Sequence, residues 1–191
     1  MTARLARALV LVAMFLAAVA AMRPALAADA IEARDVRIER PASGEGWALS
    51  ADFHVPLPQR LEEAVSRGIA LYFVVEFELV RPRWYWWDEI AASASQTWRL
   101  SYHALTQQYR VTLNDGFAQV FGSLAEALQT LSRVRGWKVI EPGQVSAGTE
   151  YRAQVRMRLD ASMLPKPFQV TAITNRDWNL QAEWTRLRFV P

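Results

Sequence analysis

The sequence predicts a mostly β protein, either an antiparallel β-sandwich or an α+β sheet, with roughly eight to ten strands and two short helices. The main observation is that apolar and polar residues alternate along many short segments separated by turn-forming residues. Helical spacing of apolar residues occurs in only two places. The chain has neither an internal repeat nor a Gly/Ser-rich linker, so we expect a single domain over residues 28–191.

The first expected elements are a hairpin, a helix and a long strand. Residues 31–40 and 47–55 alternate on either side of the turn-forming stretch PASGEG, which predicts an antiparallel hairpin. Residues 58–68 change to helical spacing, with a proline at the start and a glycine at the end. Residues 69–80 alternate again and predict the central strand, which has one apolar face to bury. That face carries Leu71, Phe73, Val75, Phe77 and Leu79.

The middle of the chain predicts further strands and the second helix. Residues 97–105 and 107–115 read as two strands, and the second ends in the turn signal Asn-Asp-Gly. Residues 117–121 predict a short strand. Residues 123–136 predict the second helix, because they open with the capping box Ser-x-x-Glu and end in a glycine.

The last part predicts a short strand from Trp137, a long alternating strand over residues 151–159, and two final strands in FQVTAI and EWTRLRFV. The long strand places Arg152, Arg156 and Arg158 in a row on its polar face. Such a row would suit an anionic ligand. Pairing with acids such as Glu76 and Glu78 on a neighbouring strand is the favoured explanation.

Residues 1–27 have the layout of a secretory signal peptide, so we expect a periplasmic protein. A basic start is followed by an apolar run of fifteen residues, 8–22, and by a small-x-small ending at Ala25 and Ala27. The run is shorter than the ~20 residues of a membrane-spanning helix. This favours cleavage after Ala27 over an uncleaved anchor, with no stable membrane span after cleavage.

The export signal also carries the net positive charge of the chain. Three of the 22 basic residues and none of the 19 acidic residues lie in residues 1–27, so the remainder is electrically balanced. A nucleic-acid partner would need a surplus of basic residues and is not expected. The chain has no cysteine, which excludes disulfides, thiol catalysis and zinc–thiolate sites.

Motifs for catalysis or for a cofactor are weak. No G-x-S-x-G motif is present, and both histidines, His54 and His103, lie on expected strands away from any serine motif. Asp52 and His54 face the same way, but two ligands are too few for a metal site. We therefore expect no metal and no cofactor, and an enzyme is the less favoured interpretation.

The stretch RPRWYWWDE, residues 81–89, is the strongest candidate for a binding site. One sheet with a solvated face cannot bury aromatic rings at four consecutive positions, so one pair is exposed, or is covered by a helix or another chain. If the alternation of the preceding strand continues, Tyr85 and Trp87 face inward. Trp84 and Trp86 then face outward, and a bulge at the intervening proline would reverse both assignments.

The charged neighbours of these rings complete the hypothesis. The expected residues for binding an envelope protein or a small extracytoplasmic ligand are Arg83, Trp84, Trp86, Asp88 and Glu89. A core role for the rings, and a purely structural interface with a membrane protein, stay open as other interpretations. The enzyme alternative is a carboxylate-dependent glycan-processing site at Asp88 and Glu89. A simpler explanation of the two acids is that they end a strand or cap a short helix beginning near Ile90.

Five blocks follow one another in this order: LPQRLEEAVSRGIALYFVVEFELVRPRWYWWDE, RLSYHALTQQYRV, SLAEALQTLSRVRGWKV, YRAQVRMRLDASMLPKPFQV and NRDWNLQAEW. Together they resemble an uncharacterised family of exported proteobacterial proteins, a domain of unknown function, over nearly all of residues 28–191. The resemblance implies a periplasmic or envelope location. It also implies that the gene lies beside the gene of a nitrogen-type sensor histidine kinase. It thereby implies an accessory of a membrane sensor kinase or of the cell envelope. It supplies no catalytic residue, because the family has no established activity.

Overall fold

A computed structural model of the chain describes residues 30–42, 44–83, 85, 87–175 and 178–191. Within these residues, nine strands form two antiparallel sheets and three helices accompany them, so the expected mostly β class is confirmed. The expected export signal over residues 1–27 lies outside the described residues. None of the helices in the described part of the chain is long and apolar enough to cross a membrane.

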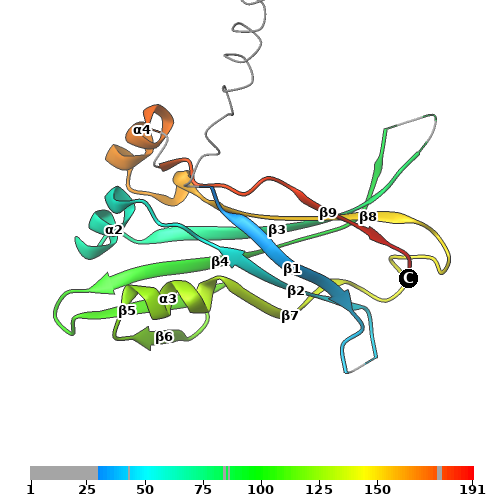
Figure 1. Cartoon of the computed structure of the whole chain (residues 1–191), viewed down its shortest axis with the longest axis horizontal. Helices are drawn as coiled ribbons and strands as arrows, with labels where there is room; N and C mark the ends of the chain where they lie inside the picture. Colours follow the sequence, from blue (N-terminus) through cyan, green and yellow to red (C-terminus); the bar gives the residue numbers. More distant parts are fainter. Residues whose placement is uncertain (1–29, 43, 84, 86, 176–177) are drawn as a thin grey trace, which may run out of the picture.

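The smaller sheet has the strand order β1-β2-β7 and the larger sheet the order β6-β5-β4-β3-β8-β9. The strands of the smaller sheet are β1 (Glu32–Glu39), β2 (Trp47–His54) and β7 (Arg133–Ile140). Those of the larger sheet are β3 (Leu71–Arg81), β4 (Glu89–His103), β5 (Gln108–Leu113), β6 (Ala118–Phe121), β8 (Tyr151–Leu159) and β9 (Thr185–Phe189). The smaller sheet runs obliquely across the larger one (Figure 1). The predicted first hairpin is confirmed as β1–β2.

The first two helices begin where their sequence signals predict. Helix α2 (Gln59–Ser66) follows Pro58 and is closed by Gly68, whose φ of +87° lies in the left-handed region that glycine adopts without strain. Helix α3 (Leu124–Leu131) is capped by Ser123, whose hydroxyl oxygen accepts a hydrogen bond of 3.2 Å from the backbone N–H of Glu126.

Two predicted elements are wrong in their extent or type. Helix α3 ends at Leu131 instead of continuing to Gly136, because Val134 is buried in β7 and pairs there with Ala51 of β2. The predicted strand FQVTAI is part of helix α4 (Lys166–Thr174). Its first turn tolerates prolines, which lack the N–H that a helix start leaves unpaired, and Phe168 stacks on Trp178 at 5.5 Å.

The suggested short helix near Ile90 is also wrong, because strand β4 begins at Glu89. The residues AASASQ that follow are poor strand formers by intrinsic propensity. They are nevertheless paired along their length with β3, for example Ser95 opposite Glu76 and Ser93 opposite Glu78. Tertiary pairing therefore overrides local preference in this half of β4.

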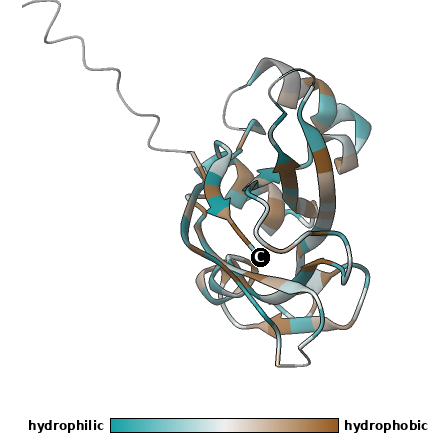
Figure 2. Ribbon diagram, turned by 90° about the vertical axis from the view of Figure 1, so that its right-hand side faces the viewer, coloured by the Kyte–Doolittle hydropathy of each residue, from teal (hydrophilic) through white to brown (hydrophobic). Residues whose placement is uncertain are grey.

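The core lies between the two sheets. The predicted inward face of β3, from Leu71 to Leu79, is confirmed, since its five residues are each at most 1% exposed. The matching residues of β8 are also buried, as predicted: Tyr151, Ala153, Val155, Met157 and Leu159. Along the strands, hydrophobic and hydrophilic residues alternate in colour (Figure 2). Burial of this alternating face is the main stabilising term that the sequence encodes.

One edge of the sandwich is closed by the segment that follows helix α4. Ala182 forms a parallel bridge with Ile31, and Gln181 forms an antiparallel bridge with Arg158 of β8. The backbone N–H of Ala182 donates to the carbonyl of Met157 at 2.8 Å. The start of the domain and its last part are therefore joined directly to the central strands.

Candidate functional site

The connection between β3 and β4 is the most prominent exposed feature of the described chain. We call residues 81–83, 85 and 87–90 the hairpin tip. In Figure 1 this hairpin projects away from the two sheets. Tyr85 is 66% exposed, Trp87 84% and Ile90 60%. A hollow of about 360 Å³ lies beside Arg81, Arg83 and Tyr85.

The inward assignment of Tyr85 and Trp87 is wrong. Strand β3 ends at Arg81, so the alternation of the preceding strand does not continue through the tip. In addition, Val80 pairs with Ile90 while Leu79 pairs with Ala92, which leaves one extra residue in β4. Such a bulge bends a hairpin and re-aims its side chains. Trp84 and Trp86 lie outside the described residues.

The charged members of the predicted site are brought together by the tip. Arg83 forms an ion pair with Glu89, and its backbone N–H lies 3.4 Å from a carboxylate oxygen of Asp88. Asp88 also lies 3.6 Å from the guanidinium of Arg152 on β8. Exposed pairs of this kind contribute ~0–1 kcal/mol each, so their main effect is to orient the loop relative to the sheet.

The arginine row of β8 is paired with acids, mainly as expected. Glu76 accepts hydrogen bonds of 2.6 Å from Arg156 and 2.9 Å from Arg158. Glu78 is bound by Gln154 instead, at 2.6 Å. Partial burial opposes ionisation of Glu76, but the two guanidinium groups outweigh it and lower the pKa of its carboxyl below the usual value.

The weaker candidates for metal binding or catalysis are explained by local contacts. Asp52 is bound by the guanidinium of Arg135 at 2.5 Å, and His54 is exposed on β2, as its strand phase predicts. The imidazole of His103 lies 3.2 Å from the hydroxyl of Thr106. Among the described residues, no group of three or more potential ligands is placed to hold a metal ion.

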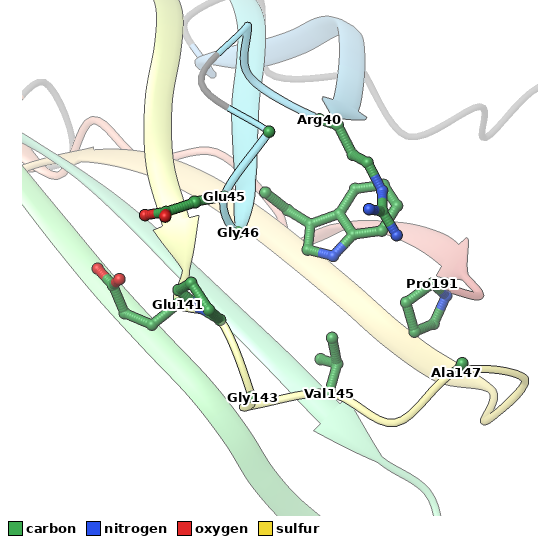
Figure 3. A pocket seen from close by; sticks show the side chains of 11 residues that line it. Arg40, Glu45, Gly46, Glu141, Gly143, Val145, Ala147 and Pro191 are labelled. Carbon is green, nitrogen blue, oxygen red and sulfur yellow. The ribbon is translucent and has the colours of Figure 1, made fainter.

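A second hollow, of about 290 Å³, lies between the β1–β2 turn and the loop after β7 (Figure 3). Arg40 lies on one side and Glu45 and Glu141 on the other (Figure 3). The guanidinium of Arg40 covers the ring of Trp47 at 4.8 Å, a cation–π contact that shields the indole from solvent. Gly46 is required here, because a Cβ at this position would lie 2.3 Å from the carbonyl oxygen of Ile140.

The two sheets and the tip define a β-rich protein with an exposed aromatic hairpin. The chain belongs to a family described as a domain of unknown function (DUF4390), whose profile matches residues 28–188. This confirms the resemblance to a family without an established activity, whereas proteobacterial origin and export stay predictions. No curated protein and no solved structure matches the chain.

Sequence reasoning selected an exposed loop but missed part of its exposed surface. It placed Arg83, Asp88 and Glu89 together, and the structure does so as well. It did not select Tyr85, Trp87 or Ile90 as binding residues, although all three are exposed. The proline that follows Arg81 was the available signal, since proline rarely continues a central strand.

Proposed function

We propose that this chain is a periplasmic binding protein, exported through a cleavable signal peptide, that binds an envelope protein through the hairpin tip. The observation that carries the proposal is the exposure of Tyr85 and Trp87 on a projecting hairpin. Apolar residues that are exposed side by side mark interaction sites, and aromatic residues together with arginine dominate the binding energy of protein interfaces. The resemblance of the sequence directs the search for this partner to membrane sensor kinases.

Export is supported by two separate features of the sequence. Residues 1–27 have the basic, apolar and small-x-small layout of a signal peptide. The family match begins at Ala28, which is the residue that would follow cleavage. The family domain and the proposed leader therefore meet at the same position.

A protein partner suits the tip better than a lipid surface. Binding to anionic membranes depends on a surplus of basic residues near the surface. At the tip, Arg83 is paired with Glu89, and Asp88 lies close to Arg152, so positive charge is balanced by negative charge. An aromatic centre with a polar, charge-balanced rim is the usual composition of a protein interface.

Binding also suits the tip better than glycan processing. A glycosidase needs two carboxylates that face the substrate across a cleft. Here Glu89 pairs with Arg83 of the same hairpin, and Asp88 lies 3.6 Å from Arg152 of β8. The two carboxylates therefore stabilise the conformation of the loop.

The proposal is tested by site-specific photocrosslinking in intact cells. A photoreactive amino acid replaces Trp87 or Ile90 in the tip, and Leu105 serves as the matched control. Leu105 is 92% exposed and lies in the turn at the opposite end of β4. We expect the same envelope protein to be captured from both tip positions and not from Leu105. We also expect the intact mass of the captured chain to correspond to a protein that starts at Ala28.

Each part of the proposal has its own contradicting result. Capture of lipid alone, equal capture from Leu105, or no capture from the tip would contradict the protein-binding role. A captured chain whose mass still includes residues 1–27 would contradict cleavage and release into the periplasm.

A further inference from the structure

A cavity between the two sheets is lined in part by polar side chains that lack hydrogen-bond or ion-pair partners in the described chain. It has a volume of about 390 Å³, within the range of small-molecule sites, which are ~300–1,000 Å³. Its walls come from β4, β5 and β6 of the larger sheet, from β7 of the smaller sheet, and from helix α3. We call it the interlayer cavity. It lies away from the residues of the hairpin tip and is independent of the function proposed above.

Gln96 is the unusual residue of this cavity. It is 4% exposed and is the one buried polar residue in the described core. It lies opposite Val75 of β3, on the inward face of β4 that also carries Trp98 and Leu100. Its side-chain amide has no hydrogen-bond partner among the described residues. Gln96 lines the cavity, whereas the neighbouring inward positions of β4 carry apolar residues, so a buried polar residue here is the informative exception.

Trp98 adds a second unused donor next to Gln96. It also lines the interlayer cavity, and its indole Nε1–H is buried without an acceptor in the described chain. Buried indole groups usually find an acceptor. Two neighbouring residues on the same face of β4 are therefore both incompletely satisfied by the protein.

The charged residues that line the cavity favour a negatively charged ligand. Of the described residues that line it, two are arginines and none is acidic. Arg135 is held by Asp52 at 2.5 Å and by the carbonyls of Ala51 and Val134 at 3.0 and 2.8 Å. Arg133, two residues earlier, makes no ion pair within the described chain. Its guanidinium is therefore available for an anion, and the planar guanidinium fork matches a carboxylate.

The remaining wall is apolar. Leu113 and Val134 line the cavity together with the indole ring of Trp98. The cavity thus combines unpaired polar groups, an arginine without an ion pair and an apolar wall. From this combination we propose that the interlayer cavity binds a small organic carboxylate with an apolar body and a second polar group. The carboxylate pairs with Arg133, the apolar body packs against Leu113 and Val134, and the second polar group hydrogen-bonds with Gln96 and Trp98.

The test uses three probes that differ by one feature each. 4-Hydroxybenzoate has the carboxylate, the ring and the inner polar group, 4-hydroxybenzamide lacks the charge, and benzoate lacks the hydroxyl. Affinity is measured by titration calorimetry on the chain from Ala28. The indole N–H signal of Trp98 is followed by NMR and assigned by comparison with Trp98→Phe. We expect 4-hydroxybenzoate to bind saturably, to shift this signal, and to bind at least about tenfold more tightly than either other probe.

Two variants separate recognition from stability. Arg133→Gln is expected to weaken 4-hydroxybenzoate binding at least about tenfold, and Arg186→Gln, on the far edge strand β9, is expected to leave it unchanged. Gln96→Leu is expected to remove the preference for 4-hydroxybenzoate over benzoate without lowering the melting temperature, because it replaces an unpartnered amide by an apolar group.

The proposal is overturned by any of three results. These are the absence of saturable 4-hydroxybenzoate binding below about 1 mM, equal binding of the uncharged amide, and binding that leaves the Trp98 signal unmoved. Should Gln96→Leu fail to fold, the comparison of Arg133→Gln with Arg186→Gln still decides the charge recognition.

Discussion

The β3–β4 hairpin uses aromatic residues in opposite ways at its two ends. Near the start of β3, Phe73 and Phe77 are at most 1% exposed and pack between the two sheets. At the tip, Tyr85 and Trp87 are largely exposed. The residue types are similar, and only their positions relative to the sheets differ. Aromatic residues along β3 therefore stabilise the fold, while those at the tip contribute little to the core.

The largest effect is expected for Phe73→Ala. Truncation of this buried ring should lower the free energy of unfolding by about 3–5 kcal/mol, because the transfer free energy is lost and a cavity remains. Phe117→Ala is the matched control, because Phe117 is fully exposed, and it should change the free energy by less than about 0.5 kcal/mol. Equal denaturation midpoints for the two variants would show that the inward face of β3 is misassigned.

An intermediate effect is expected at Glu76, on the outward face of β3. Its carboxyl has a lowered pKa in the folded state, so its stabilising contribution is present above the ordinary value of 4.5 and is lost as the pH falls through the folded-state pKa. Glu76→Gln should cost about 1–3 kcal/mol at neutral pH and should flatten the loss of stability in acid.

Glu150→Gln is the control for this measurement, because the pair between Glu150 and Arg188 is exposed. Its cost should be at most ~1 kcal/mol. Urea unfolding of both variants between neutral and acidic pH checks the prediction. An unchanged pH dependence in Glu76→Gln would mean that its two arginine contacts contribute little to folding.

The smallest effect on stability is expected at the tip. Trp87→Ala should change the free energy of unfolding by less than about 0.5 kcal/mol, since the ring is 84% exposed. The same substitution should weaken capture of the envelope partner. A loss of stability comparable to that of Phe73→Ala would remove the contrast between the two ends of the hairpin.

The sequence predicted the elements in which one face is fully buried. Alternation over Leu71 to Leu79 encodes burial directly, because a strand with one apolar face has only one way to hide it. The capping residue Ser123 and the turn at Asn114 were predictable for a similar reason, since their roles depend on local chemistry.

Elements that depend on distant partners were not predictable in this way. Residues 133–136 fit either the end of a helix or the start of a strand, and the pairing of Val134 with Ala51 decides between them. The bulge that re-aims the tip depends on the register between β3 and β4. Gln96 did leave a signal, because it is a polar residue in the same phase as Trp98 and Leu100. The cavity beside it requires both sheets.

The bridge between Ile31 and Ala182 has a consequence for the order of folding. Strand β2 pairs with β7, and β3 pairs with β8, so both sheets also need partners far along the chain. Contacts of such large sequence separation slow folding, because a long loop must close before they form. The domain cannot complete its core until nearly all of it has been synthesised. A chain with this delay stays unfolded for longer, which would suit the export proposed above.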